Sequence, residues 1–360
     1  MQVVNIVIVC FAALGAIDYL IGNKFGLGNE FVRGILMIGT CALSSVGIII
    51  LSPFISDLLS PVLKFISDNT PLDPSIISAC LLANDMGGAP LSESFGKTAE
   101  LGSFNGLVVG AMMGATTSFT LPLALSLTKK EQHGSIMLGL MCGIIAIPFG
   151  VLVSALMVGL TLSEILSSLI PLIIFAALLT VGLLKVPELC LKAFKVLGIF
   201  VKILAIVGLL GGMVSFLTGY ELIPNLAPFE DSMMIGVNAA VVLSGTLPLL
   251  FVVQKLIKKP LDRLSAKMDT NPQSMLGLVA NLATNITTFS MMEDMDEKGV
   301  VLNSAFSVSG AFVFGAHLAF TLAYKSEYLA PVIVGKLVAG AASLVIANIL
   351  YKLLIKKGKI

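Results

Sequence analysis

Charged residues are scarce in this sequence. Of its 360 residues 12% are charged and 57% are hydrophobic, and the mean hydropathy is +1.01. Soluble domains carry about 25% charged residues, and no soluble core could cover this much apolar surface. The formal net charge of +1 also argues against a nucleic-acid partner, because such a partner requires a basic surface. The composition therefore predicts a polytopic membrane protein.

Several motifs that mark enzymes and pumps are missing. The sequence has no phosphate-binding Gly-x-x-x-x-Gly-Lys and no zinc-binding His-Glu-x-x-His, which argues against ATP-driven transport within this chain and against a membrane metalloprotease. The five cysteines lack the paired spacing of metal ligands and are interpreted as small core residues. No convergent nucleophile, base or metal set is visible. We therefore expect no enzyme activity, no cofactor and no metal.

Nine apolar runs meet the requirement of about 20 residues for crossing a bilayer. The first has neither a positive beginning nor a convincing cleavage site, so it is expected to remain as a helix. Two shorter segments, residues 75–91 and 273–292, contain Asn, Thr and Gly and are interpreted as re-entrant hairpins or broken crossing helices. The nine runs are residues 3–21, 34–52, 104–127, 134–160, 165–184, 196–217, 233–257, 299–324 and 331–354.

The distribution of basic residues favours the re-entrant alternative. Residues 185–195, residues 255–267 and the C-terminal tail are strongly basic, and basic loops stay in the cytoplasm. Residues 255–267 and the tail lie on the same side of the membrane only if residues 273–292 are re-entrant. If residues 75–91 are re-entrant as well, Lys129 lies in the cytoplasm and Met1 lies outside. We therefore expect an all-α fold of about nine crossings and two re-entrant segments.

A weak internal repeat relates the two halves at a nearly constant offset of 200, as from Leu82 to Leu282, and Asp85 falls on Asn285. Each unit has two spans, a connector, a polar broken segment and two more spans. An odd number of crossings separates their starts, so the second unit would be inverted, which is a secondary-transporter plan. We expect a first repeat over residues 1–160, a linker helix and cytoplasmic loop over residues 161–195, and a second repeat over residues 196–360.

The segment around Asp85 is the strongest candidate site. Its apolar run ends at Asn84 and Asp85, and the helix breaks at Gly87, Gly88 and Pro90. A carboxylate at membrane depth costs several kcal/mol unless it is paired or hydrated, so an intramembrane acid indicates function. The plainer alternative is a capped helix end that packs against another helix.

A second candidate set lies in the other half. Asn281, Thr284, Asn285 and Thr288 are spaced three and four residues apart, so they share one stripe of a helix. They could bind an amine or a hydroxyl, or they could join neighbouring helices. The sequence leaves both alternatives open.

Two further titratable residues have an ordinary interpretation beside a functional one. Glu93 could guard access to the site, but a surface carboxylate is the commoner case. His317 lies in an apolar run and could relay protons. With no carboxylate nearby in the sequence, it is interpreted as a helix-packing residue.

The elements 84–88 (Asn-Asp-Met-Gly-Gly) and 281–285 (Asn-Leu-Ala-Thr-Asn), together with the run of spans, resemble the ethanolamine permease family of bacterial ethanolamine-utilisation operons. The similarity covers essentially the full length and includes no short diagnostic motif. It implies uptake of ethanolamine by a multi-pass protein in contact with the lipids of a bacterial cytoplasmic membrane. A homo-oligomer is compatible with it.

A small cation suits the candidate residues, because Asp85 could bind an ammonium group and Asn or Thr a hydroxyl. Without Trp and with five Tyr an aromatic cage is not expected, but Phe95, Phe104 and Phe119 could offer a cation–π face. We expect a secondary transporter or facilitator that imports ethanolamine by alternating access around a midplane site. The alternatives are a channel-like or ion-coupled permease for another small polar metabolite, a non-transporting membrane scaffold and a membrane-embedded enzyme.

Overall fold

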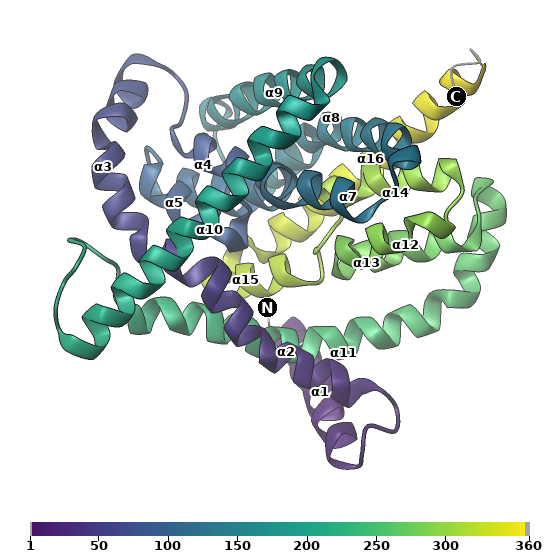
Figure 1. Ribbon diagram of the computed structural model, residues 1–360, viewed down its shortest axis with the longest axis horizontal. Coiled ribbons are helices and arrows are strands. Elements are labelled where there is room, and N and C mark those ends of the chain that lie inside the picture. The colour runs from purple at the N-terminus through teal and green to yellow at the C-terminus, as the bar shows by residue number, and fades with distance from the viewer. Residues whose placement is uncertain (1, 357–360) are drawn as a thin grey trace.

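The regular structure is entirely helical over the residues that the structure describes. This computed structural model describes residues 2–356, apart from the side chains of residues 257–264 and 266–268 (Figure 1). The first half contains α1 (Gln2–Leu20), α2 (Leu27–Cys41), η1 (Ala42–Val46), α3 (Gly47–Asn69), α4 (Ser75–Leu81), η2 (Asn84–Met86), α5 (Gly88–Phe95), α6 (Ala99–Phe104), η3 (Asn105–Gly114), η4 (Thr116–Thr120), α7 (Leu121–Leu127), η5 (Lys130–Gln132) and α8 (His133–Val158). The second contains α9 (Leu162–Lys185), α10 (Pro187–Thr218), α11 (Phe229–Met268), α12 (Pro272–Ala283), α13 (Asn285–Ser290), η6 (Met292–Asp294), α14 (Glu297–Ser309), α15 (Ala316–Tyr324), η7 (Ser326–Tyr328) and α16 (Leu329–Lys356). The predicted all-α class is therefore confirmed.

Eight helical stretches of the described chain are long and apolar enough to cross a membrane. The ninth predicted run, residues 299–324, is broken into α14 and α15 by an unwound segment at residues 310–315. In that segment the backbone N–H of Phe312 donates to the Asn281 carbonyl at 3.0 Å and that of Phe314 to the Leu282 carbonyl at 2.9 Å. Hydropathy could not reveal the break, because the unwound residues stay apolar and their backbone groups find partners on a neighbouring segment.

Two stretches that were predicted as basic loops are largely helical. α9 ends at Lys185 and α10 begins at Pro187, so Val186 alone separates them, and the backbone of α11 stays helical as far as Met268. Lysines at the ends of membrane helices extend their charged groups to the interface, so a basic run is compatible with a helix as well as a loop. Met1, the side chain of Lys258 and the end of the tail lie outside the described residues.

The two polar segments form helix hairpins. α4 packs against α5 in the first hairpin and α12 packs against α13 in the second. The Ser78 and Ser92 hydroxyls are 2.8 Å apart across the first, and the Thr288 hydroxyl donates to the Gly277 carbonyl at 2.9 Å across the second. Each tip contains extended backbone, at Leu82 and at Thr284. Each half thus contains one short helix hairpin.

The glycines and the proline of the first hairpin lie where the chain turns back. Gly87 has a φ of +88°, and a Cβ built there would lie 2.2 Å from the side chain of Ile48. A Cβ on Gly88 would lie 2.4 Å from the Leu82 carbonyl oxygen. Pro90 falls in the first turn of α5, where its missing N–H leaves no helix hydrogen bond unmade. The tip is therefore compact enough to bring backbone against backbone.

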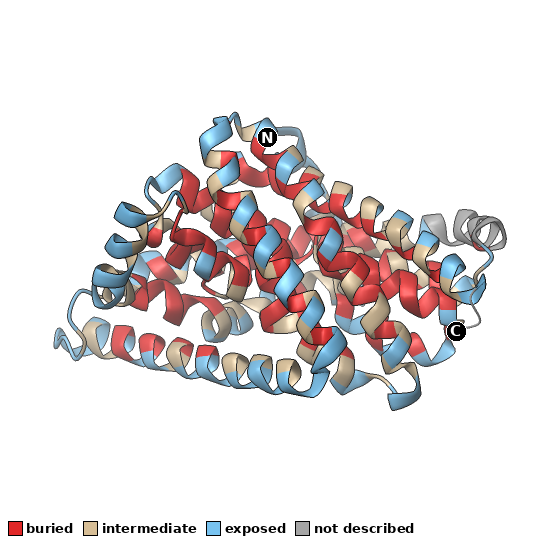
Figure 2. Ribbon diagram, turned by 90° about the horizontal axis from the view of Figure 1, so that it is seen from above, coloured by how far each residue is buried: buried red, intermediate tan, exposed pale blue. Residues whose placement is uncertain are grey.

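Long helices surround the hairpins. Buried residues concentrate in the middle of the molecule and exposed residues on the outward faces of the long helices (Figure 2). Those outward faces are apolar, as shown by Leu20 of α1 at 82% exposed, Leu178 of α9 at 66% and Leu210 of α10 at 55%. Such a surface suits contact with lipid rather than water.

Candidate functional site

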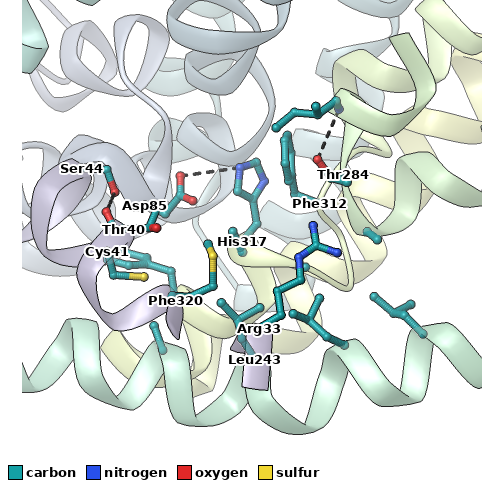
Figure 3. A pocket seen from close by; sticks show the side chains of 18 of the residues that line it. Arg33, Thr40, Cys41, Ser44, Asp85, Leu243, Thr284, Phe312, His317 and Phe320 are labelled. Atoms are coloured by element: carbon teal, nitrogen blue, oxygen red, sulfur yellow. Dashed lines mark hydrogen bonds and ion pairs between the residues drawn. The ribbon is translucent and has the colours of Figure 1, made fainter. Parts of the chain in front are cut away.

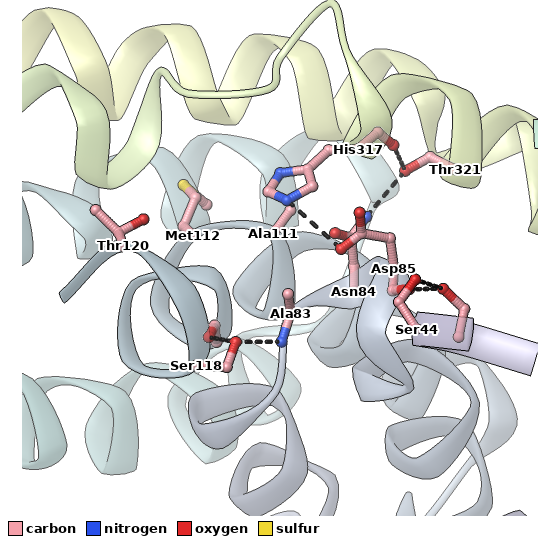
Figure 4. A network of polar contacts seen from close by, with 12 residues as sticks. Ser44, Ala83, Asn84, Asp85, Ala111, Met112, Ser118, Thr120, His317 and Thr321 are labelled. Atoms are coloured by element: carbon pink, nitrogen blue, oxygen red, sulfur yellow. Dashed lines mark hydrogen bonds and ion pairs between the residues drawn. The ribbon is translucent and has the colours of Figure 1, made fainter. Parts of the chain in front are cut away.

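Each hairpin tip forms a hydrogen bond with the opposite half of the chain. The side-chain amide of Asn84 donates to the Thr321 hydroxyl at 3.4 Å, and that of Asn285 donates to the Thr120 hydroxyl at 3.0 Å. Thr321 gives its own proton to the His317 carbonyl at 2.7 Å, so its oxygen is free to accept from Asn84 (Figure 4). Both asparagines are 0% exposed. The same polar contact is thus made twice, once from each half.

These contacts shift the register of the predicted repeat by one residue. Asn84 and Asn285 differ by 201 (285 − 84), as do Thr120 and Thr321 (321 − 120). The same offset relates two glycines at which a Cβ would collide with a carbonyl oxygen, Gly114 with that of Leu82 and Gly315 with that of Ala283. At this offset Asn84 falls on Asn285, whereas the predicted offset of 200 places Asp85 there. At the same offset Asp85 falls on Ile286.

A cavity of about 710 Å³ lies beside the two tips. Its wall combines polar groups from α2, η1 and the first tip with residues of α11, the second hairpin and α15 (Figure 3). The polar and aromatic lining residues include Glu30, Arg33, Thr40, Ser44, Ser45, Asp85, Phe119, Gln254, Thr284, Thr287, Phe312, His317 and Phe320. Arg33, whose side chain is 61% exposed, marks an end of the cavity near the protein surface.

The carboxylate of Asp85 faces this cavity and has His317 as a neighbour. The distance from Asp85 Oδ1 to His317 Nε2 is 3.7 Å, and the two side chains are 22% and 3% exposed. The Nδ1 atom of His317 is buried without a hydrogen-bond partner among the described residues. The sequence interpretation of His317 as a packing residue assumed that no carboxylate lay nearby, and the structure places one beside it. Its carboxylate neighbour comes from the other half of the chain, which no local pattern could reveal.

Lys336 is a second polar residue that sequence reasoning missed. It lies on α16, 1% exposed, and its Nζ donates to the Ala111 carbonyl at 2.5 Å. A lysine well inside a long apolar run was the available signal, because such a charge is expensive and usually functional.

The predicted site residues separate into three places. Asp85 and Thr284 line the cavity. Asn84, Asn281, Asn285 and Thr288 are buried behind its wall and bond to protein groups, as in the Asn281 amide that donates to the Asn303 carbonyl at 3.4 Å. These bonds favour the helix-joining alternative for the asparagines and Thr288. Glu93 lies away from the cavity.

Glu93 instead joins the first hairpin to the end of α15. Its carboxylate accepts from Lys325 Nζ at 2.6 Å and from the Tyr324 hydroxyl at 2.7 Å. Glu293, which follows the second hairpin, forms an ion pair with Lys129, just after α7. The hydrogen bond with Glu293 raises the pKa of Lys129 above its ordinary value, because it favours the charged ammonium. The hairpins are thus tied to the opposite half by ion pairs as well as by amides.

Aromatic rings line one side of the cavity, but they are not all the predicted ones. Phe119 and Phe312 meet edge to face with ring centroids 5.8 Å apart, and Phe312 lies 5.0 Å from the His317 ring. Phe95 and Phe104 are buried outside the cavity wall. Of the three predicted phenylalanines, Phe119 alone could therefore contact a cation there, together with Phe312.

Long apolar helices around polar hairpins and an internal cavity define a multi-pass membrane protein with the architecture of a permease. The chain belongs to the family described as "Ethanolamine utilisation protein, EutH", whose profile matches residues 1–350. Its resemblance to the ethanolamine permeases is thereby confirmed, together with its assignment as a multi-pass bacterial membrane protein.

Relatives with permease names cover almost the whole chain. A "Probable ethanolamine permease EutH" of Listeria monocytogenes is 41% identical over 358 residues, which are 99% of this chain and 96% of that protein. The protein of the same name in Salmonella typhimurium is 32% identical, over 97% of this chain and 95% of its own length. The "Uncharacterized protein YxeR" of Bacillus subtilis is 34% identical, over 94% of this chain and 91% of its own length. No solved structure matches the chain. Family membership supports a transporter rather than an enzyme.

Proposed function

We propose that this protein imports ethanolamine, as the protonated amino alcohol, across the cytoplasmic membrane by alternating access around the cavity at Asp85. The observation that carries the proposal is the Asp85 carboxylate in the wall of a cavity that lies among membrane-length helices. Glu30 also lines this cavity, but it is paired with Arg33. An intramembrane carboxylate needs hydration or a partner, and a cationic substrate supplies one. The names of the relatives supply the identity of that substrate.

Within the cavity, the ammonium group binds Asp85 and contacts the faces of Phe119 and Phe312. The hydroxyl group of the substrate bonds to the Thr284 hydroxyl, which is on the opposite hairpin tip. Substrate therefore bridges the two tips. Binding at a junction between the halves is what couples a small ligand to their relative movement.

The proposed architecture is a pair of inverted repeats, with a first unit at residues 1–160, a linker at residues 161–195 and a second unit at residues 196–360. The exchanged amide contacts at an offset of 201 support this symmetry. α14 and α15 then form one broken crossing, which with the eight long stretches restores nine. The first hairpin re-enters from outside and the second from the cytoplasm.

Uptake of radiolabelled ethanolamine into proteoliposomes that contain only this protein tests the proposal. At a pH where the amine is protonated, Asp85→Asn should lower affinity at least tenfold, because a hydrogen bond to a charged group contributes about 1.5–3 kcal/mol. Glu30→Gln is the matched control, because Glu30 also lines the cavity but is paired with Arg33 at 3.5 Å. Wild-type affinity and rate for Asp85→Asn would refute the assignment of Asp85 as the ammonium site. No uptake by the wild-type protein would instead indicate a non-transporting scaffold.

A further inference from the structure

The two halves differ in one segment that lies beside each hairpin. Residues 310–315, between α14 and α15, are unwound, and at the offset of 201 they fall on residues 109–114 (310 − 201 and 315 − 201). Those residues belong to η3, a run of 10 residues in π-helical conformation. A Cβ on the last residue of either segment, Gly114 or Gly315, would collide with a carbonyl oxygen of the neighbouring hairpin. The two segments therefore take equivalent places but have different backbone conformations.

Both conformations are uncommon. Phe312, within the unwound segment, has a φ of +60°, a left-handed value that a bulky residue adopts only under strain. The other non-glycine residues with a positive φ in the described part of the chain are Asn and Asp, which tolerate it. In the first half, the π-helical run is exceptional, because π-helices are rare and usually span a single turn. Neither segment therefore rests in an ordinary α-helix.

The first arm of each hairpin has a carbonyl group that these segments satisfy in different ways. In the second half, the backbone N–H of Phe312 donates to the Asn281 carbonyl at 3.0 Å. The carbonyl at the same offset in the first half is that of Cys80 (281 − 201), and the Thr117 hydroxyl donates to it at 2.8 Å, the shortest of the four contacts of that hydroxyl. The residue at the offset of Phe312 is Ala111 (312 − 201), which lies within η3. A side-chain hydroxyl thus takes in the first half the place that a backbone N–H takes in the second.

We propose that the two segments trade conformations during transport, so that residues 109–114 unwind and residues 310–315 become helical when the cavity opens to the opposite side of the membrane. This inference rests on the inverted-repeat transport proposed above. Two inverted repeats present the same element to opposite faces, so an interchange of their conformations converts one opening into the other. The Ala111 N–H then binds the Cys80 carbonyl, and Phe312 leaves its left-handed conformation. Because one segment winds as the other unwinds, backbone groups at membrane depth keep their partners.

Phe312 links the second segment to the proposed substrate site. Its ring lines the cavity, with its centroid 5.8 Å from that of Phe119 and 5.0 Å from that of His317 (Figure 3). Winding residues 310–315 into a helix changes the φ of Phe312 and so the direction of its side chain. A cation that contacts this ring therefore binds the two conformations with different affinity, which is the requirement for a ligand to shift the balance between them.

The conformation in the structure has its cavity open toward the cytoplasm in the proposed orientation. The cavity ends near the surface at Arg33, which follows the first crossing and so lies on the cytoplasmic side when Met1 is outside. Unwinding of residues 109–114 should accompany the outward-open state. A glycine at Ala111 and a glycine at Phe312 should therefore have opposite effects on access from outside.

The rate at which a cavity cysteine reacts with an impermeant maleimide, added to intact cells without ethanolamine, tests the inference. Ser44→Cys, in a background without the native cysteines, is the reporter, because Ser44 lines the cavity and belongs to neither segment. Ala111→Gly should raise the outside rate about fivefold, because glycine is less stable than alanine in a helix. Ala124→Gly, at a buried alanine of α7, is the control and should leave the rate unchanged. Phe312→Gly should lower the outside rate about fivefold relative to Phe312→Ala, which removes the same ring but keeps the strained φ.

The outcomes separate this inference from the proposed function. Rates that change in the same direction in Ala111→Gly and Phe312→Gly, or equal rates in Phe312→Gly and Phe312→Ala, would overturn the interchange. Ethanolamine uptake by the wild-type protein beside such a result leaves the substrate assignment intact, because the rates are measured without substrate. Absence of uptake by the wild-type protein overturns the proposed function whatever the rates are.

A second variant keeps the test decisive if Ala111→Gly fails to fold. Thr117→Val should raise the outside rate about fivefold, because the Cys80 carbonyl loses its hydroxyl partner only in the conformation with a helical η3. Thr180→Val, which removes a hydroxyl that donates to the Ala176 carbonyl within α9, is the control and should behave as the reporter alone. An unchanged rate in Thr117→Val would overturn the interchange.

Discussion

Asn84 and Asn285 make equivalent contacts in the two halves of the protein, each giving its side-chain amide to a threonine of the opposite half. In each case the Oδ1 atom of the asparagine is buried without a hydrogen-bond partner among the described residues. Each tip is therefore held by the same type of hydrogen bond, from its own asparagine to a threonine of the other half. Any movement of one half against the other must break or remake both.

Replacing either asparagine by alanine should destabilise the protein by a similar amount. Hydrogen bonds of this kind contribute about 0.5–1.5 kcal/mol in proteins, and the values measured between membrane helices are near the lower end. We expect Asn84→Ala and Asn285→Ala each to lower the thermal midpoint by a few degrees. Asn69→Ala, at an exposed residue at the end of α3, is the control and should have no effect. A large loss in one variant and none in the other would contradict the exchanged arrangement.

Gly87→Ala should impair folding, because the tip depends on a backbone conformation that alanine disfavours. Gly87 has a φ of +88°, and a Cβ would lie 2.2 Å from the Ile48 side chain. The left-handed conformation alone costs about 1–2 kcal/mol for a residue with a Cβ. Gly198→Ala, at a helical glycine with open space around it, should be neutral or stabilising. Thermal unfolding and the yield of monodisperse protein measure both. Equal behaviour of the two variants would contradict this account of the tip.

Local sequence patterns predicted much of this fold. Runs of about 20 apolar residues located the long helices. The polar, glycine-rich composition of residues 75–91 correctly marked a break in the first half, and Asp85 was recognised as an acid at membrane depth. These features depend on residues close together in the chain, so a single sequence contains the information needed to find them.

The contacts that build the site come from residues far apart in the chain. His317 and Asp85 are 232 residues apart (317 − 85), and Lys336 and Ala111 are 225 apart, so their proximity depends on how the halves pack. The break between α14 and α15 escaped detection because residues 310–315 are apolar. The offset of 201 shared by the two amide contacts also differs by one residue from the offset of 200 in the sequence, a difference that so biased a composition could not reveal.

Cysteines placed at the ends of the long helices should show by their labelling which ends face outside and which face the cytoplasm. In a background without the native cysteines, Glu221→Cys, between α10 and α11, should react with an impermeant maleimide added to intact cells. Glu131→Cys, in η5 beside Lys129 and Lys130, should react only after the cells are opened, because basic segments remain in the cytoplasm. Labelling of Glu131→Cys from outside would invalidate the proposed orientation of both hairpins.

The ion pairs at the ends of the hairpins should close the cavity separately, one pair toward each side of the membrane. Glu93 and Lys325 are 26% and 27% exposed, whereas Glu293 and Lys129 are 63% and 56% exposed. An exposed ion pair contributes about 0.2–1 kcal/mol. The Glu93 carboxylate, which also accepts from Tyr324, should contribute more, since charge-assisted hydrogen bonds contribute about 1.5–3 kcal/mol. The Glu93–Lys325 pair, which lies on the outer side in the proposed orientation, should therefore be the stronger of the two in this conformation.

Removing that stronger pair should open the cavity to the outside. A cysteine introduced by Thr284→Cys, in the cavity wall, reports access to the cavity by its rate of reaction with an impermeant reagent. Adding Glu93→Gln should raise the rate from outside about tenfold or more, because loss of about 1.5 kcal/mol shifts a two-state equilibrium by that factor. Adding Glu293→Gln should leave the outside rate unchanged or lower it, because weakening the cytoplasmic pair favours opening to the opposite face. An equal increase in both variants would show that the two pairs only stabilise the protein, and would remove them from the transport cycle.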